Sequence, residues 1–164
     1  MSERFGVRGV LILLVIISST CSNAWAASAA ALGKSNFHEY LEALENVDAN
    51  ALRTRFYHEK FAIRQGDTVM GVDELLAFET SMKEVADFKF NVQRLVADDD
   101  AIAMEAIETF DVRENAALPN IGPVLAGERY AQHLIVFYAL TDGRISGIDV
   151  KVLSVEKLET TSGN

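Results

Sequence analysis

Apolar residues recur every three or four positions in three stretches of the chain, which is the spacing of one buried helix face. The stretches are residues 35–47, 48–56 and 71–85. Ser35 is placed to cap the first helix by accepting from its free amides. Gly71 opens the third helix, where Asp73 and Glu74 favour the positive end of the helix dipole. The pattern therefore predicts three amphipathic helices.

The remaining stretches alternate apolar and polar residues with a period of two, as strands with one buried face do. One strand is expected at residues 58–65, and four more at residues 88–93, 101–112 and the two halves of 130–149. The last two strands turn at residues 141–143, and a loop is expected at residues 113–128, which hold both prolines. This order predicts an α+β domain with a curved antiparallel sheet wrapped around the N-terminal helices.

The first 26 residues have the order of a secretory signal peptide. Positive charges precede the apolar run Val10–Ile17, and small residues surround Trp25 at the end of the segment. The run is too short to span a bilayer comfortably. We expect cleavage after Ala26 and a periplasmic or secreted protein with no stable membrane insertion. An uncleaved anchor and a lipoprotein attached at Cys21 are the alternatives.

Cleavage at that site predicts a linker at residues 27–34, a domain at residues 35–156 and a disordered tail at residues 157–164. The mature chain would lose Cys21, its only cysteine, so no disulfide is expected. Hydrophobic residues make up 49% of the chain, which is enough for a full core. A net charge of −9 argues against nucleic acid as a partner, because phosphate binding needs a basic surface.

The last hairpin carries the candidate catalytic residues. A turn at residues 141–143 would place Ile135 opposite Asp149 and His133 opposite Lys151. His133 and Asp149 would then be diagonal neighbours on one face of the sheet. The carboxylate of Asp149 could hold the imidazole in one tautomer, so that His133 acts as a general base. The alternative is that both residues lie on the outer face, toward solvent or a dimer partner.

Three further residues are candidates for binding. Tyr57 stands between the second helix and the first strand, where it either donates to a ligand oxygen or packs as a core aromatic. Arg64 could bind an anionic ligand or simply be solvated. Glu105 and Glu108 fall on opposite faces of one strand, so one of them points toward the apolar side unless a bulge intervenes. A carboxyl buried there would have a raised pKa and could act as acid or base.

The segments YLEALENVDANAL, MGVDELLAF and GERYAQHLIVFYALTDGRISGIDV together carry a family likeness. Their order and spacing, with GxxELLxF after a turn and DGRI between two apolar strands, resemble the nuclear transport factor 2-like superfamily, in particular its SnoaL-like members. The resemblance covers roughly residues 37–154. It implies a cone-shaped fold, in which a bent sheet curls around the helices and leaves a pocket at the open end, and it implies frequent homodimers.

The resemblance implies several possible functions, because the superfamily includes isomerases, epoxide hydrolases, dehydratases and polyketide cyclases as well as binding modules without chemistry. Its steroid isomerases place an acidic base near the end of the first strand. This chain has Ile63, Arg64 and Gln65 there, and Ile135 near the place of their second acid, so steroid-type isomerisation is not expected.

We therefore expect an exported SnoaL-like domain that binds a small, largely apolar molecule. A polyketide-cyclase-like acid–base enzyme of the same fold, working without a cofactor as a cyclase, isomerase or hydrolase, is the alternative. The histidines His38, His58 and His133 lack metal-ligand spacing, so no metal is expected.

Overall fold

The computed structural model describes residues 31–65 and 68–159. Four helical segments are present in this part: α1 (Phe37–Glu45), α2 (Ala49–Ala51), the π-helical turn η1 (Leu52–Phe56) and α3 (Val72–Val85). The strands are β1 (Tyr57–Gln65), β2 (Thr68–Met70), β3 (Ala86–Ala97), β4 (Ala101–Val112), β5 (Ala116–Leu118), β6 (Gly122–Val124), β7 (Arg129–Thr141) and β8 (Arg144–Leu158). Each helix and strand expected from the sequence pattern is present, with ends that differ by a few residues.

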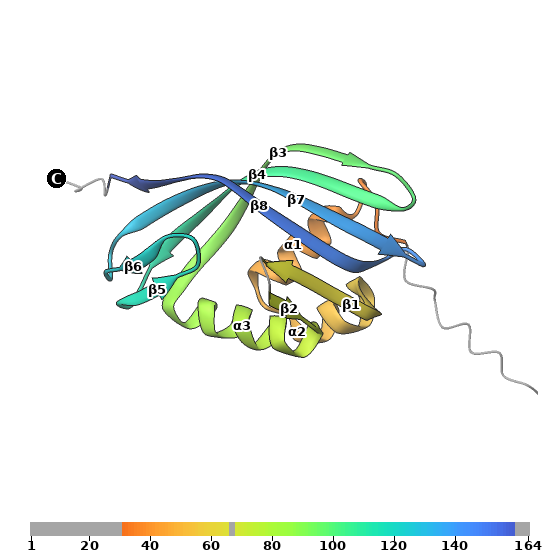
Figure 1. The fold of residues 1–164 in the computed structure, drawn as a ribbon, viewed down its shortest axis with the longest axis horizontal. Helices are drawn as coiled ribbons and strands as arrows, with labels where there is room; N and C mark the ends of the chain where they lie inside the picture. The colour runs from red at the N-terminus through yellow and green to blue at the C-terminus, as the bar shows by residue number, and fades with distance from the viewer. Residues whose placement is uncertain (1–30, 66–67, 160–164) are drawn as a thin grey trace, which may run out of the picture.

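Six strands form one sheet in the order β2-β1-β8-β7-β4-β3. Neighbours run antiparallel except β1 and β8, which are parallel. Figure 1 shows the long strands β3, β4, β7 and β8 arching over the helices, with α3 beneath the arch. The fold is therefore the predicted α+β arrangement of a curved, mainly antiparallel sheet and N-terminal helices.

The concave face of the sheet carries the core because side chains alternate along each strand. The even-numbered residues of β4 and β7 point inward, and the core includes Ile102, Met104, Ala106, Leu134, Val136 and Tyr138. Phe37, Tyr40 and Leu52 from the helices are also fully buried. Burial of each such large side chain contributes about 1.5–3 kcal/mol, which keeps the helices against the sheet.

The β7–β8 hairpin turns where the sequence predicts, but its register differs from the expected one. Asp142 and Gly143 take the left-handed conformation, with φ of 51° and 68°, and form a two-residue turn. A register shift then follows, so that Ala139 pairs with Gly147, and Phe137 pairs with Asp149. A second shift pairs His133 with Ser154. Both shifts are bulges, in which one strand carries an extra residue.

The segment expected as a loop at residues 113–128 holds a small second sheet instead. Strands β5 and β6 pair antiparallel, and Asn120 turns between them with φ of 61°. Leu118 and Val124 are buried in a second apolar cluster with Phe88 and Phe110, which docks this hairpin onto the main sheet. The β5–β6 hairpin lies below one end of the arch formed by the long strands, as Figure 1 shows.

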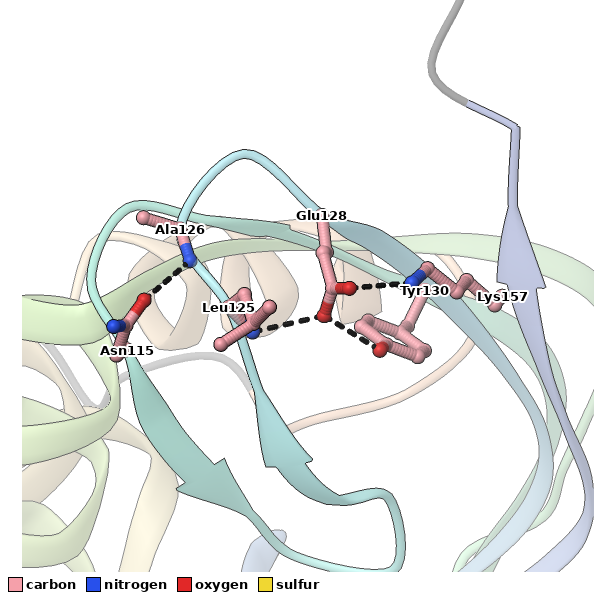
Figure 2. Close-up of polar contacts among 6 residues, drawn as sticks. All are labelled: Asn115, Leu125, Ala126, Glu128, Tyr130 and Lys157. Atoms are coloured by element: carbon pink, nitrogen blue, oxygen red, sulfur yellow. Dashed lines mark hydrogen bonds and ion pairs between the residues drawn. The ribbon is translucent and has the colours of Figure 1, made fainter.

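Glu128 anchors the β5–β6 hairpin to the long strands (Figure 2). Its Oε2 accepts from the backbone N–H of Leu125 and from the hydroxyl of Tyr130, each at 2.8 Å. Lys157 of β8 donates to its Oε1. These three hydrogen bonds lower the pKa of Glu128 to about 2, and the bond from Lys157 has the largest effect. Asn115 accepts from Ala126 N–H at 2.9 Å nearby.

Both ends of the described chain pack on the domain. Leu32 is buried, and its N–H donates to the carbonyl of Gly143 at 2.9 Å, so part of the expected linker belongs to the fold. Asn36, rather than Ser35, immediately precedes α1. Strand β8 continues to Leu158, beyond the expected domain end at residue 156. The proposed signal peptide at residues 1–26 and the tail from residue 160 lie outside the described residues. Among residues 31–65 and 68–159, which the structure describes, no helix is long and apolar enough to cross a membrane.

Candidate functional site

A cavity of about 130 Å³ lies between the concave face of the sheet and the helices. Its wall is mostly apolar, with residues from α1, α3 and all six strands of the main sheet. Pro119 and Asn120, at the tip of the β5–β6 hairpin, also line it, so the hairpin closes part of one side. The polar residues in the wall besides Asn120 are Tyr40, Tyr57, Glu79, Glu108, Gln132 and Tyr138.

Glu79 enters the cavity from α3. It lies four residues after Leu75 and three before Met82, so the helix places all three on one face. Leu75 and Met82 are buried, and Glu79 is half-buried among the cavity residues. Burial disfavours the charged form and raises the pKa of Glu79 to about 7.

Glu108 enters the cavity from β4. It follows the buried residues Ile102, Met104 and Ala106 at a spacing of two, so the strand directs it to the same concave face. Burial, and secondarily the charge of Glu79, raise the pKa of Glu108 to about 8. A carboxyl in this setting carries a proton near neutral pH and can either donate that proton or accept one.

Gln132 lies beside Glu108, because the two residues are paired across β4 and β7. Apart from the tyrosines, it is the only buried polar side chain among the described residues, with 3% of its surface exposed. Its Nε2 donates to the carbonyl of Pro119 at 3.4 Å, which is a long bond. Gln132 thus links the hairpin tip to the sheet at the cavity wall.

Three tyrosines also line the cavity. The ring of Tyr40 packs edge-on against the rings of Tyr57 and Tyr138, with centroids 6.1 Å and 5.6 Å apart. Burial raises the pKa of all three hydroxyls, so they stay protonated. The hydroxyl oxygen of Tyr57 is buried and has no geometric hydrogen-bond partner in the described part of the chain, although the hydroxyl of Tyr40 lies close enough to affect its pKa. A buried hydroxyl left without a partner costs free energy, so this atom is poised to bond a ligand.

No lysine, arginine or histidine is among the described residues that line the cavity. The two carboxyls therefore have no cationic side chain to balance them when they ionise. The described residues also contain no group of three or more His, Cys, Asp or Glu placed to hold a metal ion. The wall can supply two exchangeable protons, hydroxyl groups and apolar contacts.

The structure places one of the sequence-predicted site residues in the cavity, and that residue is Tyr57. Glu105 and His133 lie on the outer face of the sheet, where His133 Nε2 is 3.0 Å from Glu105 Oε1. Asp149 is exposed on the same face and pairs with Phe137. Arg64 is exposed as well, level with Asp149 on the parallel neighbour strand.

The expected diagonal contact between His133 and Asp149 is therefore wrong. The two-residue turn and the bulge beside it each move the register by one position, so that Phe137 rather than Ile135 stands opposite Asp149. The second bulge moves the partner of His133 on to Ser154. His133 instead meets Glu105 of β4, since Glu105 pairs with Ile135 and Ile107 with His133. The even-numbered residues Leu134, Val136, Tyr138 and Ile148 form the core side of this hairpin as expected, with His133 and Asp149 on the other face. Ile145, expected on the outer face, is instead fully buried.

The sequence reasoning missed Glu79 and selected Glu105 where the structure places Glu108 in the cavity. A signal for each was present. Glu79 interrupts the apolar stripe of its helix between Leu75 and Met82. Glu108 shares the even-numbered positions of the apolar residues in its strand. A carboxyl that occupies a position on the buried face is a candidate for function.

Residues 37–148 match the model of the SnoaL-like domain family. The chain belongs to this family, a member of the nuclear transport factor 2-like superfamily. None of the curated proteins matches the sequence.

Solved structures with the same fold have low sequence identity to this chain. TsrD from Streptomyces laurentii is 15% identical with a TM-score of 0.60, over 73% of this chain and 86% of that one. A SnoaL-like polyketide cyclase from Agrobacterium tumefaciens is 16% identical with a TM-score of 0.59, over 71% and 87%. An LEH-like epoxide hydrolase from M. tuberculosis is 16% identical with a TM-score of 0.55, over 72% and 80%. These similarities establish the fold alone.

Proposed function

We propose that this SnoaL-like domain binds a small, largely apolar molecule in the cavity and holds a polar group of that molecule between Glu79 and Glu108. The observation that carries the proposal is that two carboxyls face one mostly apolar cavity. Such groups are costly to bury without partners, so a site that retains them has a polar group to recognise. The unpartnered hydroxyl of Tyr57 supports the same conclusion.

The size of the cavity suits a compact ligand. A cavity of about 130 Å³ is close to the roughly 150 Å³ engineered cavity that takes up benzene in another protein. We therefore expect the apolar part of the ligand to be about the size of one six-membered ring.

Binding of fluorobenzene, followed by ¹⁹F NMR, tests this proposal. Val150 lines the cavity, so Val150→Phe fills it and is expected to abolish saturable binding. Val96 is 62% exposed and pairs with Ala103 on the outer face, so Val96→Phe is the matched control and should bind as the wild type does. Equal, non-saturable binding in all three proteins would refute the proposal.

Cofactor-independent acid–base catalysis is a second candidate function. It is favoured by the raised pKa values of about 7 for Glu79 and about 8 for Glu108, because groups that titrate near neutral pH can act as both acid and base. The polyketide cyclase and epoxide hydrolase with this fold are consistent with such a role.

The ring opening of 1,2-benzisoxazole tests base catalysis in the cavity. In this reaction a base removes the proton at C3, the N–O bond breaks, and 2-cyanophenol forms. We expect a saturable rate that rises with pH as Glu79 and Glu108 ionise. The double variant E79Q/E108Q should lose it, and E105Q should retain it. An undiminished rate in the double variant would exclude these carboxyls as the base.

The proposal includes export and a homodimer. The signal-peptide pattern of residues 1–26 supports export, and the N-terminal sequence of the secreted or periplasmic protein should begin after Ala26.

Phe137 is 56% exposed on the outer face of the sheet, which suits contact with a second copy. Light scattering should give twice the mass of the mature chain, and a strictly monomeric mature protein at high concentration would refute the dimer.

A further inference from the structure

We propose that the ligand of the cavity is an organic amine, whose ammonium group lies between Glu79 and Glu108 and whose apolar group fills the remaining space. This inference rests on the proposed function and specifies the ligand class for the same site.

The charges around the cavity point to a cation. The titratable groups that face it are Glu79 from α3, Glu108 from β4, and the tyrosines Tyr40, Tyr57 and Tyr138 from α1, β1 and β7. All of these groups are acids, and the described lining contains no basic side chain. A bound ammonium would stabilise the ionised form of the carboxyls, because an opposite charge a few ångströms away favours the charged form.

The hydrogen-bonding groups match an ammonium better than a carbonyl. A primary ammonium has three donors and no acceptor. The cavity offers two carboxyl groups, which become acceptors when they ionise, and the hydroxyl oxygen of Tyr57, a residue that is 2% exposed and whose hydroxyl has no geometric hydrogen-bond partner in the described chain. A ligand carbonyl can accept from the protonated carboxyls, but it has no donor and no positive charge with which to stabilise them once they ionise.

The aromatic wall supports the same ligand class. Tyr40, Tyr57 and Tyr138 contribute rings to the cavity wall, and the negative face of an aromatic ring attracts an ammonium. A metal ion fits less well, since the described residues include no cluster of three or more typical metal ligands. A cation with an attached apolar group satisfies both the carboxyls and the apolar wall.

Calorimetric titration with three ligands that share one ring tests the inference. The ligands are benzylamine, benzyl alcohol and benzoate, which carry a positive, a neutral and a negative head group. At pH 8 we expect benzylamine to bind the purified protein at least about tenfold more tightly than benzyl alcohol, since each unit by which the amine lowers a carboxyl pKa corresponds to a factor of ten. Benzoate should bind most weakly, because its charge repels the carboxyls.

Variants locate the effect in the cavity. In E79Q and in E108Q the preference for benzylamine should fall several-fold, and in the double variant the two ligands should bind equally. E105Q is the matched control, because Glu105 lies on the same strand as Glu108 but on the outer face, and it should keep the wild-type preference.

Proton release provides a readout that needs no variant. Both carboxyls are largely protonated at pH 6.5 in the empty cavity, so an ammonium that ionises one of them releases a proton. Titrations in two buffers of different ionisation enthalpy should report about one proton released for benzylamine and none for benzyl alcohol.

The outcomes separate this inference from the proposed function. If benzyl alcohol and fluorobenzene bind in the cavity but benzylamine has no advantage and releases no proton, the amine inference is overturned and the proposed function stands. If none of these compounds binds saturably, the proposed function fails and the amine inference fails with it.

Discussion

Glu79 and Glu108 face the same cavity from different elements, Glu79 from the helix beneath the sheet and Glu108 from the sheet itself. The charge of Glu79 is one of the causes that raise the pKa of Glu108. The two groups therefore titrate as an interacting pair, and the first proton lost makes the second harder to lose.

The stability of the protein should fall as pH rises between about 4.5 and 8. Folding raises the pKa of Glu79 to about 7 and of Glu108 to about 8, so the native state binds more protons than the unfolded state in this window. Each group lowers the free energy of unfolding by at most about 1.4 kcal/mol per pH unit, and the decrease ends above about pH 8. Urea unfolding at a series of pH values measures this free energy.

The E79Q/E108Q double variant serves as the comparison for that series. Its unfolding free energy should change less between pH 5 and pH 8 than that of the wild type, and it should be the more stable protein at pH 8. E105Q, on the outer face, should follow the wild-type profile. Identical pH profiles for the double variant and the wild type would show that the two carboxyls are not perturbed by folding.

Tyr57→Phe should leave the empty protein as stable as the wild type or stabilise it by about 1 kcal/mol. The hydroxyl that it removes is buried and unpartnered among the described residues, so its loss relieves a desolvation cost without breaking a bond. Benzylamine binding should weaken at the same time, because the ammonium loses an acceptor. Thermal unfolding and calorimetry measure the two effects, and a clear loss of stability would contradict the assignment of Tyr57 to the ligand.

Glu128→Ala should loosen the β5–β6 hairpin. It removes the acceptor of the Leu125 amide, so hydrogen exchange of that amide should accelerate, whereas Asn115→Ala should affect the Ala126 amide instead. Folding lowers the pKa of Glu128 to about 2, so its contribution is present above about pH 4.5 and is lost as pH falls toward 2. Unchanged exchange of Leu125 in Glu128→Ala would contradict this role.

His133→Ala and Asp149→Ala should leave ligand binding in the cavity unchanged. Both side chains lie on the outer face, where His133 contacts Glu105 and Asp149 is exposed. Titration of the two variants with fluorobenzene measures this. A tenfold or greater loss of affinity in either variant, with the fold intact by circular dichroism, would show that the substituted residue contributes to ligand binding.

The order of elements could be predicted from the sequence because each helix and strand shows its periodicity locally. The apolar alternation of residues 134–138 likewise predicted the buried face of β7. The pairing of β7 with β8 was not predictable in detail, since it depends on the turn length and on where the bulges lie. At the bulge near the turn the buried positions of β8 change from odd-numbered (Ile145) to even-numbered (Ile148). The β5–β6 hairpin was missed because its strands have only three residues each.

The candidate site was harder to predict because it depends on contacts between distant elements. Tyr57, singled out for its position between the second helix and the first strand, lines the cavity. Glu79 and Glu108 are 29 residues apart and meet only through the curvature of the sheet over α3. Sequence alternation showed that either Glu105 or Glu108 points inward, and the even-numbered apolar positions that Glu108 shares indicated which one.

The titration of the glutamate carboxyls is the most direct test of the two-carboxyl cavity. It can be followed by ¹³C NMR of protein labelled at the glutamate side-chain carboxyl carbon, with E79Q and E108Q to assign the signals. We expect two carboxyls to titrate near pH 7 and pH 8, and both to move to lower pH when benzylamine is bound. If the signals of Glu79 and Glu108 both titrate below pH 5 in the free protein, the proposed site is contradicted.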